Sequence, residues 1–257
     1  MRITLLQHPI IWADKTANLT LWEQRLHALK GTTDLAVLPE MFTTGFCTDQ
    51  MELAEEMNGT TVQWLKHTSA STGIALTGSF LAAEGDKRYN RAFFVTPDGK
   101  MDYADKRHLF TMGGEREHLS GGSDTLLVHY MGVNIRVLVC YDLRFPVWAR
   151  NTNNAYDLLI YVANWPQARI ADWDILLPAR AVENQAYVCG VNRVGDAPGD
   201  LHYNGHSVII DPRGRVVEKL SDDQEGTLSG LIDLALVEKG RTKFPVWQDA
   251  DQFTIEK

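Results

Sequence analysis

The stretch VNIRVLVCYDLRFP, residues 133–146, joins an apolar run to a polar and charged segment at Cys140. The residues just before the cysteine are continuously apolar, which is typical of a strand covered on both faces. FPVWAR, at 145–150, reads as the opening of a helix. We therefore predict a buried strand that ends at Cys140 and turns into a helix. At such a turn the cysteine projects from the carboxyl edge of a sheet, beside free backbone N–H groups.

Short β-rich runs alternate with helical patterns along the rest of the chain. The runs predict strands at 2–7, 34–39, 74–80, 91–97, 125–130, 133–139, 157–163, 187–192 and 206–211. Helices are predicted at 19–29, at 62–70 and after Phe145, and a fourth helix includes 176–185, with Pro178 in its first turn or at a kink. PDG at 97–99 and DPRG at 211–214 predict hairpin turns.

The number of predicted strands is too large for one open sheet, and the mixture of crossover helices and hairpins implies mixed pairing. Two mixed sheets packed face to face, with helices outside, would bury all the strands. We therefore predict an α/β fold of this kind. No linker, repeat or low-complexity tract divides the 257 residues, so we predict a single domain over 1–257, with a C-terminal tail from about 238.

Composition limits the classes of partner and compartment. The net charge is -8, which disfavours nonspecific binding to nucleic acid or to an anionic membrane. No stretch approaches the roughly 18 apolar residues of a membrane span. Three cysteines, Cys47, Cys140 and Cys189, lie too far apart for a disulfide framework. We therefore expect a cytoplasmic protein that binds neither nucleic acid nor membrane.

Cys140 is a candidate nucleophile, although most lone cysteines are small buried packing residues. A thiol needs a base, and an attacked carbonyl needs cationic or N–H partners. None of the eight histidines stands in a setting that singles it out as the base. Glu40 directly follows an apolar strand in DLAVLPEMFTTGF, and Lys106 ends the second arm of the PDG hairpin in YADKRHLF. Each alone is more often a solvated surface residue, so the residues by themselves leave these roles open.

Three segments, in order, carry a resemblance to a known family. LPEMFTTGF (38–46), YADKRHLF (103–110) and VLVCYDLRFP (137–146) resemble the signature segments of the nitrilase superfamily, the carbon–nitrogen hydrolases. GEREHLSGG resembles the lid region of that family, and YVANWP, ARAVENQAYV, NRVG and SVIIDPRG resemble its later blocks, so the similarity runs from Met1 to about Asp233. KRHLF, CYDLRFP and ANWP are most similar to the ω-amidase branch, which removes the terminal amide of 2-oxo acids such as 2-oxoglutaramate.

The resemblance implies a four-layer αββα sandwich and assigns a role to each motif residue. Glu40 would be the base, Lys106 would stabilise the oxyanion and Cys140 would be the nucleophile that forms a thioester. Glu115 matches the additional acidic residue of the family, and the backbone N–H of Tyr141 would be a second oxyanion donor. No metal or organic cofactor is implied. Two protomers commonly pack helix layer on helix layer in this family, so a homodimer is expected, with Trp247 in a tail that lies against the neighbouring subunit.

The carboxylate of a 2-oxo acid requires an arginine or several N–H donors in the pocket. Arg169, on the loop after ANWP, is the first candidate. Arg144 is the alternative, unless it pairs with Asp142 as part of the scaffold, and Arg180 lies in a matching block as well. Aromatic residues that would wall the pocket are Phe110, Trp165 and Trp173, although aromatic side chains at such positions are more often core residues.

Other readings of the sequence stay open. Within the same chemistry, the substrate would be another small amide, such as an N-carbamoyl amino acid or a deaminated peptide; a true nitrilase is less favoured. From a different class, a non-catalytic binding protein would keep the fold and lose a member of the triad, and none is lost here. HYNGH places His202 and His206 four residues apart, but Asn204 and Gly205 disfavour a helix and no third ligand is evident, so no metal site is predicted.

Overall fold

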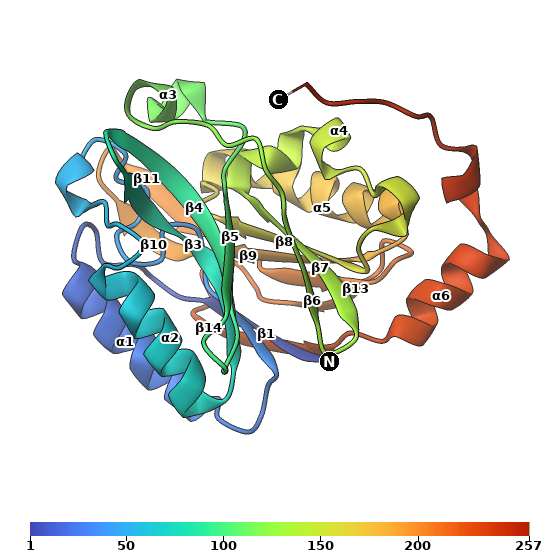
Figure 1. Cartoon of the computed structure of the whole chain (residues 1–257), viewed down its shortest axis with the longest axis horizontal. Coiled ribbons are helices and arrows are strands. Elements are labelled where there is room, and N and C mark those ends of the chain that lie inside the picture. The colour runs from blue at the N-terminus through green and yellow to red at the C-terminus, as the bar shows by residue number, and fades with distance from the viewer. Residues whose placement is uncertain (257) are drawn as a thin grey trace.

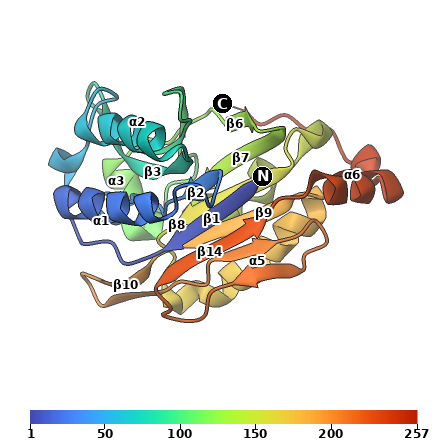
Figure 2. The same ribbon diagram turned by 90° about the horizontal axis from the view of Figure 1, so that it is seen from below.

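The computed structural model describes residues 1–256 and contains two six-stranded mixed sheets packed face to face between helices (Figure 1). One sheet has the strand order β14-β1-β2-β3-β4-β5 and the other β13-β12-β9-β8-β7-β6. Helices α1 and α2 cover the outer face of the first sheet, and α5 covers that of the second (Figure 2), with α4 packed in the same layer as α5. The predicted α/β sandwich of four αββα layers is therefore confirmed.

The first sheet combines parallel and antiparallel pairs. Strands β1, β2 and β3 are parallel, while β14 and the β3-β4-β5 meander add antiparallel neighbours. The elements of this half are β1 (Arg2–Gln7), α1 (Lys15–Ala28), β2 (Leu35–Val37), α2 (Thr60–Thr72), β3 (Ala75–Glu84), β4 (Lys87–Val95), β5 (Met101–Asp105) and β14 (Gly226–Leu231).

The second sheet has a parallel centre, β7-β8-β9, and antiparallel edges. Its elements are β6 (Leu126–Tyr130), β7 (Val133–Val139), α4 (Pro146–Ala149), β8 (Leu158–Ala163), α5 (Ile170–Asn184), β9 (Tyr187–Asn192), β12 (Val208–Ile210) and β13 (Val216–Lys219). Outside the sandwich lie α3 (Glu115–His118), the separate hairpin β10 (Val194–Ala197) and β11 (Leu201–Asn204), and α6 (Leu234–Lys243). Short 3₁₀ helices occupy Met51–Leu53, Thr111–Gly113, Cys140–Arg144, Thr152–Asn154, Gln167–Arg169 and Val246–Asp249.

Three apolar layers hold the sandwich together. Side chains from both sheets, such as Leu5 and Ile160, meet in a fully buried layer between the sheets. Trp22 joins α1 to the first sheet, and Leu177 joins α5 to the second. This arrangement explains why the central strands β2, β8 and β9 are buried along their whole length, since both faces of the sheets are covered there.

Both predicted hairpin turns form, and each has a glycine in the left-handed region. Gly99 has φ 86° and joins β4 to β5, and Gly214 has φ 77° and joins β12 to β13. A side chain is strained in this conformation, so glycine is the residue that such turns require.

Some predicted boundaries are wrong. Helix α5 contains nearly all of the predicted stretch 176–185 but begins earlier, at Ile170, so Pro178 lies inside the helix and the alternative that placed it in the first turn is wrong. The described part of the C-terminal region begins with α6, which spans the predicted start of the tail at 238. Beyond α6 the chain returns over its own subunit, where Arg107 donates a hydrogen bond of 2.8 Å to the carbonyl of Glu256.

Strands β10, β11 and β14 were not predicted, and β5 and β13 were implied only as the second arms of the two hairpins. These strands are short or largely exposed and lack a clear apolar alternation. No helix within residues 1–256 is both long enough and apolar enough to cross a membrane.

Candidate active site

The predicted site residues stand at strand ends in both sheets. Glu40 follows β2 and Lys106 follows β5 in the first sheet, while Cys140 follows β7 in the second. The carboxyl end of β2 in the first sheet lies near the carboxyl ends of β7 and β8 in the second, since Asn164, which follows β8, contacts both Glu40 and Cys140. The structure therefore brings together residues from three distant segments, across the junction of the two sheets.

Lys106 lies between two carboxylates. Its Nζ is 2.9 Å from Oε1 of Glu40 and 2.9 Å from Oε2 of Glu115, and all three side chains are fully buried. Burial alone would lower the pKa of Lys106, but the attraction of Glu115 and Glu40 outweighs it and raises that pKa. Burial raises the pKa of Glu115, against the attraction of Lys106. A protonated lysine is therefore fixed beside the predicted base.

Cys140 begins a 3₁₀ turn at the end of β7 and has a φ of 45°. Its Sγ is 3.9 Å from the carbonyl oxygen of Asn164. Burial and the negative charge of Glu40 raise the pKa of the Cys140 thiol well above its usual range, and the opposing effect of Lys106 is smaller. The free protein therefore holds a neutral thiol, and a base has to remove its proton during attack.

Two asparagines that the sequence analysis did not single out hold Glu40 in place. The backbone N–H of Asn164 donates to Oε2 of Glu40 over 2.8 Å, and its Nδ2 donates to the Glu40 carbonyl over 2.7 Å. Asn90 donates from Nδ2 to Oε1 over 2.8 Å. Asn164 directly follows an apolar strand in ANWP, just as Cys140 does in VLVC. This position at a strand end could have marked Asn164 as a site residue. Asn90 lies within a strand and carried no such signal.

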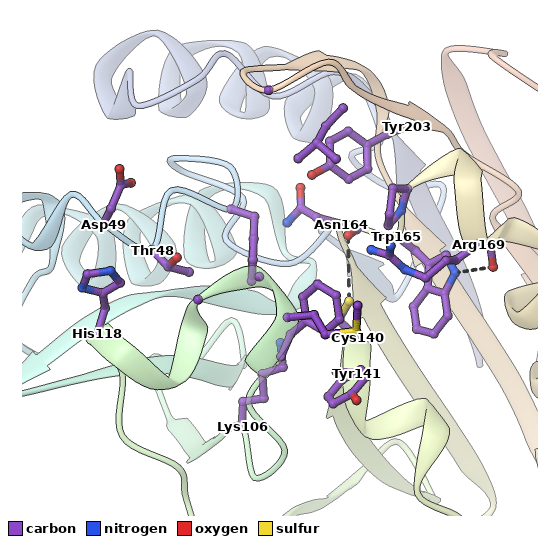
Figure 3. A pocket seen from close by; sticks show the side chains of 18 of the residues that line it. Thr48, Asp49, Lys106, His118, Cys140, Tyr141, Asn164, Trp165, Arg169 and Tyr203 are labelled. Atoms are coloured by element: carbon purple, nitrogen blue, oxygen red, sulfur yellow. Dashed lines mark hydrogen bonds between the residues drawn. The ribbon is translucent and has the colours of Figure 1, made fainter.

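A cavity of about 540 Å³ opens onto Cys140, and most of its wall is aromatic or apolar (Figure 3). Phe110, Tyr141 and Trp165, all from the predicted set, line it beside the nucleophile. Lining residues that were not predicted include Trp12, Phe46, Thr48, Asp49, Met112, His118, Leu201 and Tyr203. Thr48, Asp49 and His118 lie at the end of the cavity away from Arg169 (Figure 3). Several of these residues sit on loops or on the β10-β11 hairpin, which the sequence patterns did not place.

Arg169 and Arg144 both line the cavity. The Cζ of Arg169 lies 5.0 Å from the centroid of the Phe110 ring, and Arg169 makes no ion pair with a carboxylate within the part of the chain that the structure describes. Arg144 stacks on Trp165 and pairs with Asp172, with 2.6 Å between Nη2 and Oδ2. Arg169 therefore has the guanidinium that is free to meet an anion.

The alternative pairing of Arg144 with Asp142 is wrong. The side chain of Asp142 turns back to the end of β7, where it accepts from the backbone N–H of Val139 over 3.1 Å and from that of His108 over 3.0 Å. Because the Asp142 carboxylate accepts hydrogen bonds from these backbone N–H groups, Arg144 forms its ion pair with Asp172 on α5 instead. Arg180 is buried away from the cavity and donates to the carbonyl of Leu143.

Trp173 does not line the cavity, contrary to the prediction. It lies behind Trp165, with 5.5 Å between the ring centroids, and its indole N–H donates to the carbonyl of His206 over 3.1 Å. Because it sits on the inner face of α5, it packs in the core below the wall rather than in the wall itself.

The histidines of HYNGH are held separately by different carboxylates. His202 contacts Asp196 and Asp223, each at 2.7 Å, whereas His206 pairs with Asp174 and Asp222. Across residues 1–256, no group of three or more histidine, cysteine, aspartate or glutamate side chains is arranged to hold a metal ion.

The arrangement suits attack of a thiol on a carbonyl carbon. It offers a neutral thiol, a carboxylate to accept its proton and an ammonium to stabilise an oxyanion, all at the base of a largely apolar cavity. This combination is the minimum for covalent hydrolysis of an amide.

Comparison with known proteins also points to hydrolysis of carbon–nitrogen bonds, and the similarity covers nearly the whole chain. The sequence profile of the carbon-nitrogen hydrolase family matches residues 2–242. The chain is 43% identical over 255 residues to the omega-amidase YafV of Yersinia enterocolitica, covering 99% of this chain and 98% of that protein. It is 35% identical over 252 residues to the 2-oxoglutaramate amidase of Bacillus subtilis, covering 96% of each.

Among solved structures, the chain is similar to XC1258 of Xanthomonas campestris, a CN-hydrolase superfamily protein with an arsenic adduct in its active site. The TM-score is 0.97 at 40% identity, with coverage of 100% of this chain and 99% of the other. With the profile match and the full-length relatives, these findings show that the chain belongs to the carbon–nitrogen hydrolase family and is a hydrolase of amides.

Proposed function

We propose that this protein is an ω-amidase, which hydrolyses the terminal amide of a small 2-oxo acid such as 2-oxoglutaramate to the acid and ammonia. The observation that carries the proposal is the contact of Lys106 with Glu40 beside Cys140, in a cavity that also contains the unpaired guanidinium of Arg169. The names of the Yersinia and Bacillus relatives agree with this substrate class.

In the first half of the reaction, Sγ of Cys140 attacks the amide carbon while Glu40 takes the thiol proton. The carbonyl oxygen becomes an oxyanion, which Lys106 and the backbone N–H of Tyr141 stabilise. Donors of this kind are typically worth about 3 kcal/mol each in the transition state. Glu40 then returns the proton to the leaving nitrogen, the C–N bond breaks, and ammonia departs from a thioester.

In the second half, water attacks the thioester carbon while Glu40 accepts one of its protons. The C–S bond breaks, the carboxylic acid is released, and the proton returns to sulfur. Glu115 holds Lys106 in position, since both of its oxygens lie within 3.1 Å of Nζ. The cycle uses side chains and water alone, so we propose that no metal or organic cofactor takes part.

Arg169 is our candidate for the carboxylate of the 2-oxo acid, because it lines the cavity without an ion-pair partner of its own. Arg144 lies on the same wall but is already neutralised by Asp172, so it contributes less. Phe110 and Trp165 would cover the carbon chain of the substrate.

The direct test is to trap the intermediate. The protein is mixed with 2-oxoglutaramate, quenched rapidly and digested, and an acyl adduct on the Cys140 peptide is expected by mass spectrometry. Cys140→Ala should give no adduct and no ammonia. Release of ammonia from N-carbamoyl amino acids or deaminated peptides, with none from 2-oxoglutaramate, would favour another small amide instead. A folded wild-type protein that is inactive on every amide would indicate a non-catalytic binding protein.

We further propose that the whole chain acts as one cytoplasmic domain that forms a homodimer and binds neither nucleic acid nor membrane. Three free cysteines support a reducing compartment. Exposed apolar side chains on the outer helix layer, Val147, Ile175 and Val182, support packing of helix layer on helix layer. Sedimentation at micromolar concentration tests the assembly, and a monomer would reject it.

A further inference from the structure

Asn90 is a fully buried residue of β4 that lies between the two carboxylates of the site. Its Nδ2 donates to Oε1 of Glu40 over 2.8 Å and to Oε1 of Glu115 over 3.2 Å. An amide nitrogen carries two hydrogens, so both are used. Asn90 is thus an uncharged side chain that bridges both acids and is not a member of the Glu40, Lys106 and Cys140 set.

Ser79 fixes the orientation of this amide. The backbone N–H of Met41 donates to Oγ of Ser79 over 3.0 Å, and Oγ lies 2.8 Å from Oδ1 of Asn90. Both groups that face Nδ2 are carboxylates, which accept when ionised, and the serine hydroxyl can donate its hydrogen to Oδ1. A flipped amide would set its oxygen against two carboxylates, so only one orientation satisfies every partner.

The bridge addresses an electrostatic problem of the site. Two carboxyl groups share one ammonium in a water-poor environment, and burial together with the charge of Glu40 raises the pKa of Glu115. A neutral donor that serves both stabilises their negative charge without adding a charge that would compete with Lys106 for the oxyanion. No other side chain among the described residues donates to both Glu40 and Glu115 except Lys106 itself.

The bridge also determines which oxygen of Glu40 is available. Oε1 accepts from Lys106 and from Asn90, which occupies both of its lone-pair directions. Oε2 accepts a hydrogen bond of 2.8 Å from the backbone N–H of Asn164, whose carbonyl oxygen lies 3.9 Å from Sγ of Cys140. Its second donor, Nδ2 of Asn164, is at 3.4 Å and is closer to the Glu40 carbonyl, at 2.7 Å, so Oε2 is the less fully occupied oxygen and lies on the side of the nucleophile.

We propose that Asn90 is a positioning residue that holds the carboxyl groups of Glu40 and Glu115 in place beside Lys106 and leaves Oε2 of Glu40 to accept the thiol proton. This inference rests on the roles proposed above for Glu40 and Cys140. Asn90 acts through Glu40 and touches neither substrate nor sulfur.

The test compares Asn90→Leu, which keeps the size and removes the donor, with Ser79→Ala, which keeps the donor, frees the amide to rotate and also removes the acceptor of the Met41 N–H. Thr77→Val is the matched control: Thr77 is also buried on β3, two residues from Ser79, but its hydroxyl donates to the carbonyl of Phe93 and not to the site. For each variant, kcat/KM for 2-oxoglutaramate is measured from pH 5 to 9, with thermal unfolding to show that the protein is folded.

In Asn90→Leu the acid limb of the pH profile of kcat/KM should move to higher pH by about one unit. The reason is that a carboxyl group that loses a hydrogen-bond donor, here Glu40, is harder to ionise. The value of kcat at pH 7 should fall by about 10- to 100-fold. Ser79→Ala should shift the limb in the same direction by less, and Thr77→Val should leave it in place. A folded Asn90→Leu with the wild-type limb overturns the inference; if Asn90→Leu does not fold, an unshifted limb in Ser79→Ala overturns it.

Glu40→Gln separates this inference from the proposed function. If Glu40→Gln hydrolyses the amide at the wild-type rate, the role of Glu40 as base is wrong, whatever Asn90 does. If Glu40→Gln is inactive while Asn90→Leu and Ser79→Ala keep the wild-type profile, only the role of Asn90 is rejected.

Discussion

At the scale of single residues, Glu40 acts on Cys140 in two opposite ways. Its negative charge raises the pKa of the thiol, yet in the proposed reaction it is the base that removes the proton. Glu40→Gln should therefore change the rate of amide hydrolysis and the reactivity of the Cys140 thiol in opposite directions. Amide hydrolysis should fall by about 10²- to 10⁴-fold, because the general base is lost. Alkylation of Cys140 by iodoacetamide near pH 7 should become faster, because Lys106 then stabilises the thiolate without opposition from Glu40.

The measurement is the rate of alkylation at the Cys140 peptide from pH 6 to 9, followed by mass spectrometry, with Cys140→Ala as the blank. Slower alkylation in Glu40→Gln than in the wild type would contradict the electrostatic account of the site.

Arg169 and Arg144 offer a matched pair for substrate charge. Arg169→Gln should raise KM for 2-oxoglutaramate far more than KM for a neutral amide of similar length, by roughly 10-fold or more, because a charged hydrogen bond to the substrate carboxylate is lost. Arg144→Gln should have a smaller effect, since Arg144 is paired with Asp172. Steady-state kinetics on both amides checks this, and equal effects of Arg169→Gln on the two substrates would remove Arg169 from the carboxylate site.

At the scale of elements, the packing of α5 on β9 depends on a glycine. A Cβ at Gly190 would lie 2.6 Å from Cδ1 of Leu177 and 2.7 Å from Cζ2 of Trp173, closer than atoms can approach. Gly190→Ala should lower the free energy of unfolding by about 1–3 kcal/mol through overpacking. Gly240→Ala, in α6 where nothing lies within 4 Å, should raise it by about 0.4–1 kcal/mol. Urea unfolding of both variants gives the comparison, and a neutral Gly190→Ala would show that α5 is free to shift.

The β10-β11 hairpin, which carries Leu201 and Tyr203 of the cavity wall, is fastened at His202. Hydrogen bonds to Asp196 and Asp223 raise the pKa of His202 above 6.5. The stabilisation is therefore complete below the unfolded-state pKa near 6.5 and is lost as the pH rises through the higher folded-state value. The difference in Tm between the wild type and His202→Gln should be largest at pH 6 and should shrink by pH 9. A difference that grows with pH would contradict this assignment.

At the scale of the whole molecule, the site exists only while the two sheets keep their spacing, because Glu40 and Lys106 come from one sheet and Cys140 from the other. Ile160→Ala, between the sheets, should lower stability by about 2–5 kcal/mol and should also lower kcat. Leu26→Ala, between α1 and the outer face, should cost similar stability with kcat unchanged. Urea unfolding measures the loss of stability in each variant, and steady-state kinetics on the folded variants measures kcat. Equal kcat values in the two variants would contradict the dependence of the site on sheet spacing.

The sequence predicted the elements with strong apolar patterns and the residues within the family segments. The sandwich, both hairpin turns and the strand that ends at Cys140 follow from apolar runs and turn residues. The meeting of Glu40, Lys106 and Glu115 was reached through the resemblance, because a single charged residue after a strand carries no sign of its partner.

Other features of the site and fold could not be predicted from the sequence, for physical reasons. The choice of Asp172 over Asp142 by Arg144 depends on which groups are left free where β7 ends. Trp173 was misplaced because the sequence shows that a tryptophan is buried but not on which side of a wall. Asn90 lies in a strand whose pattern does not distinguish an asparagine facing a site from one facing a turn, and β13 is exposed along its whole length.

The pairing of β14 with β1 has a consequence for synthesis of the chain. Arg2 pairs with Leu231 and Gln7 with Gly226, so β1 cannot complete its pairing in the sheet until β14 has been synthesised. Until then, one hydrogen-bonding edge of an apolar strand stays open, in the state most prone to pair with other nascent chains. RITLLQ therefore needs protection from the time it emerges until residues 226–231 have followed, and a nascent chain that stalls before residue 226 carries an unfinished sheet.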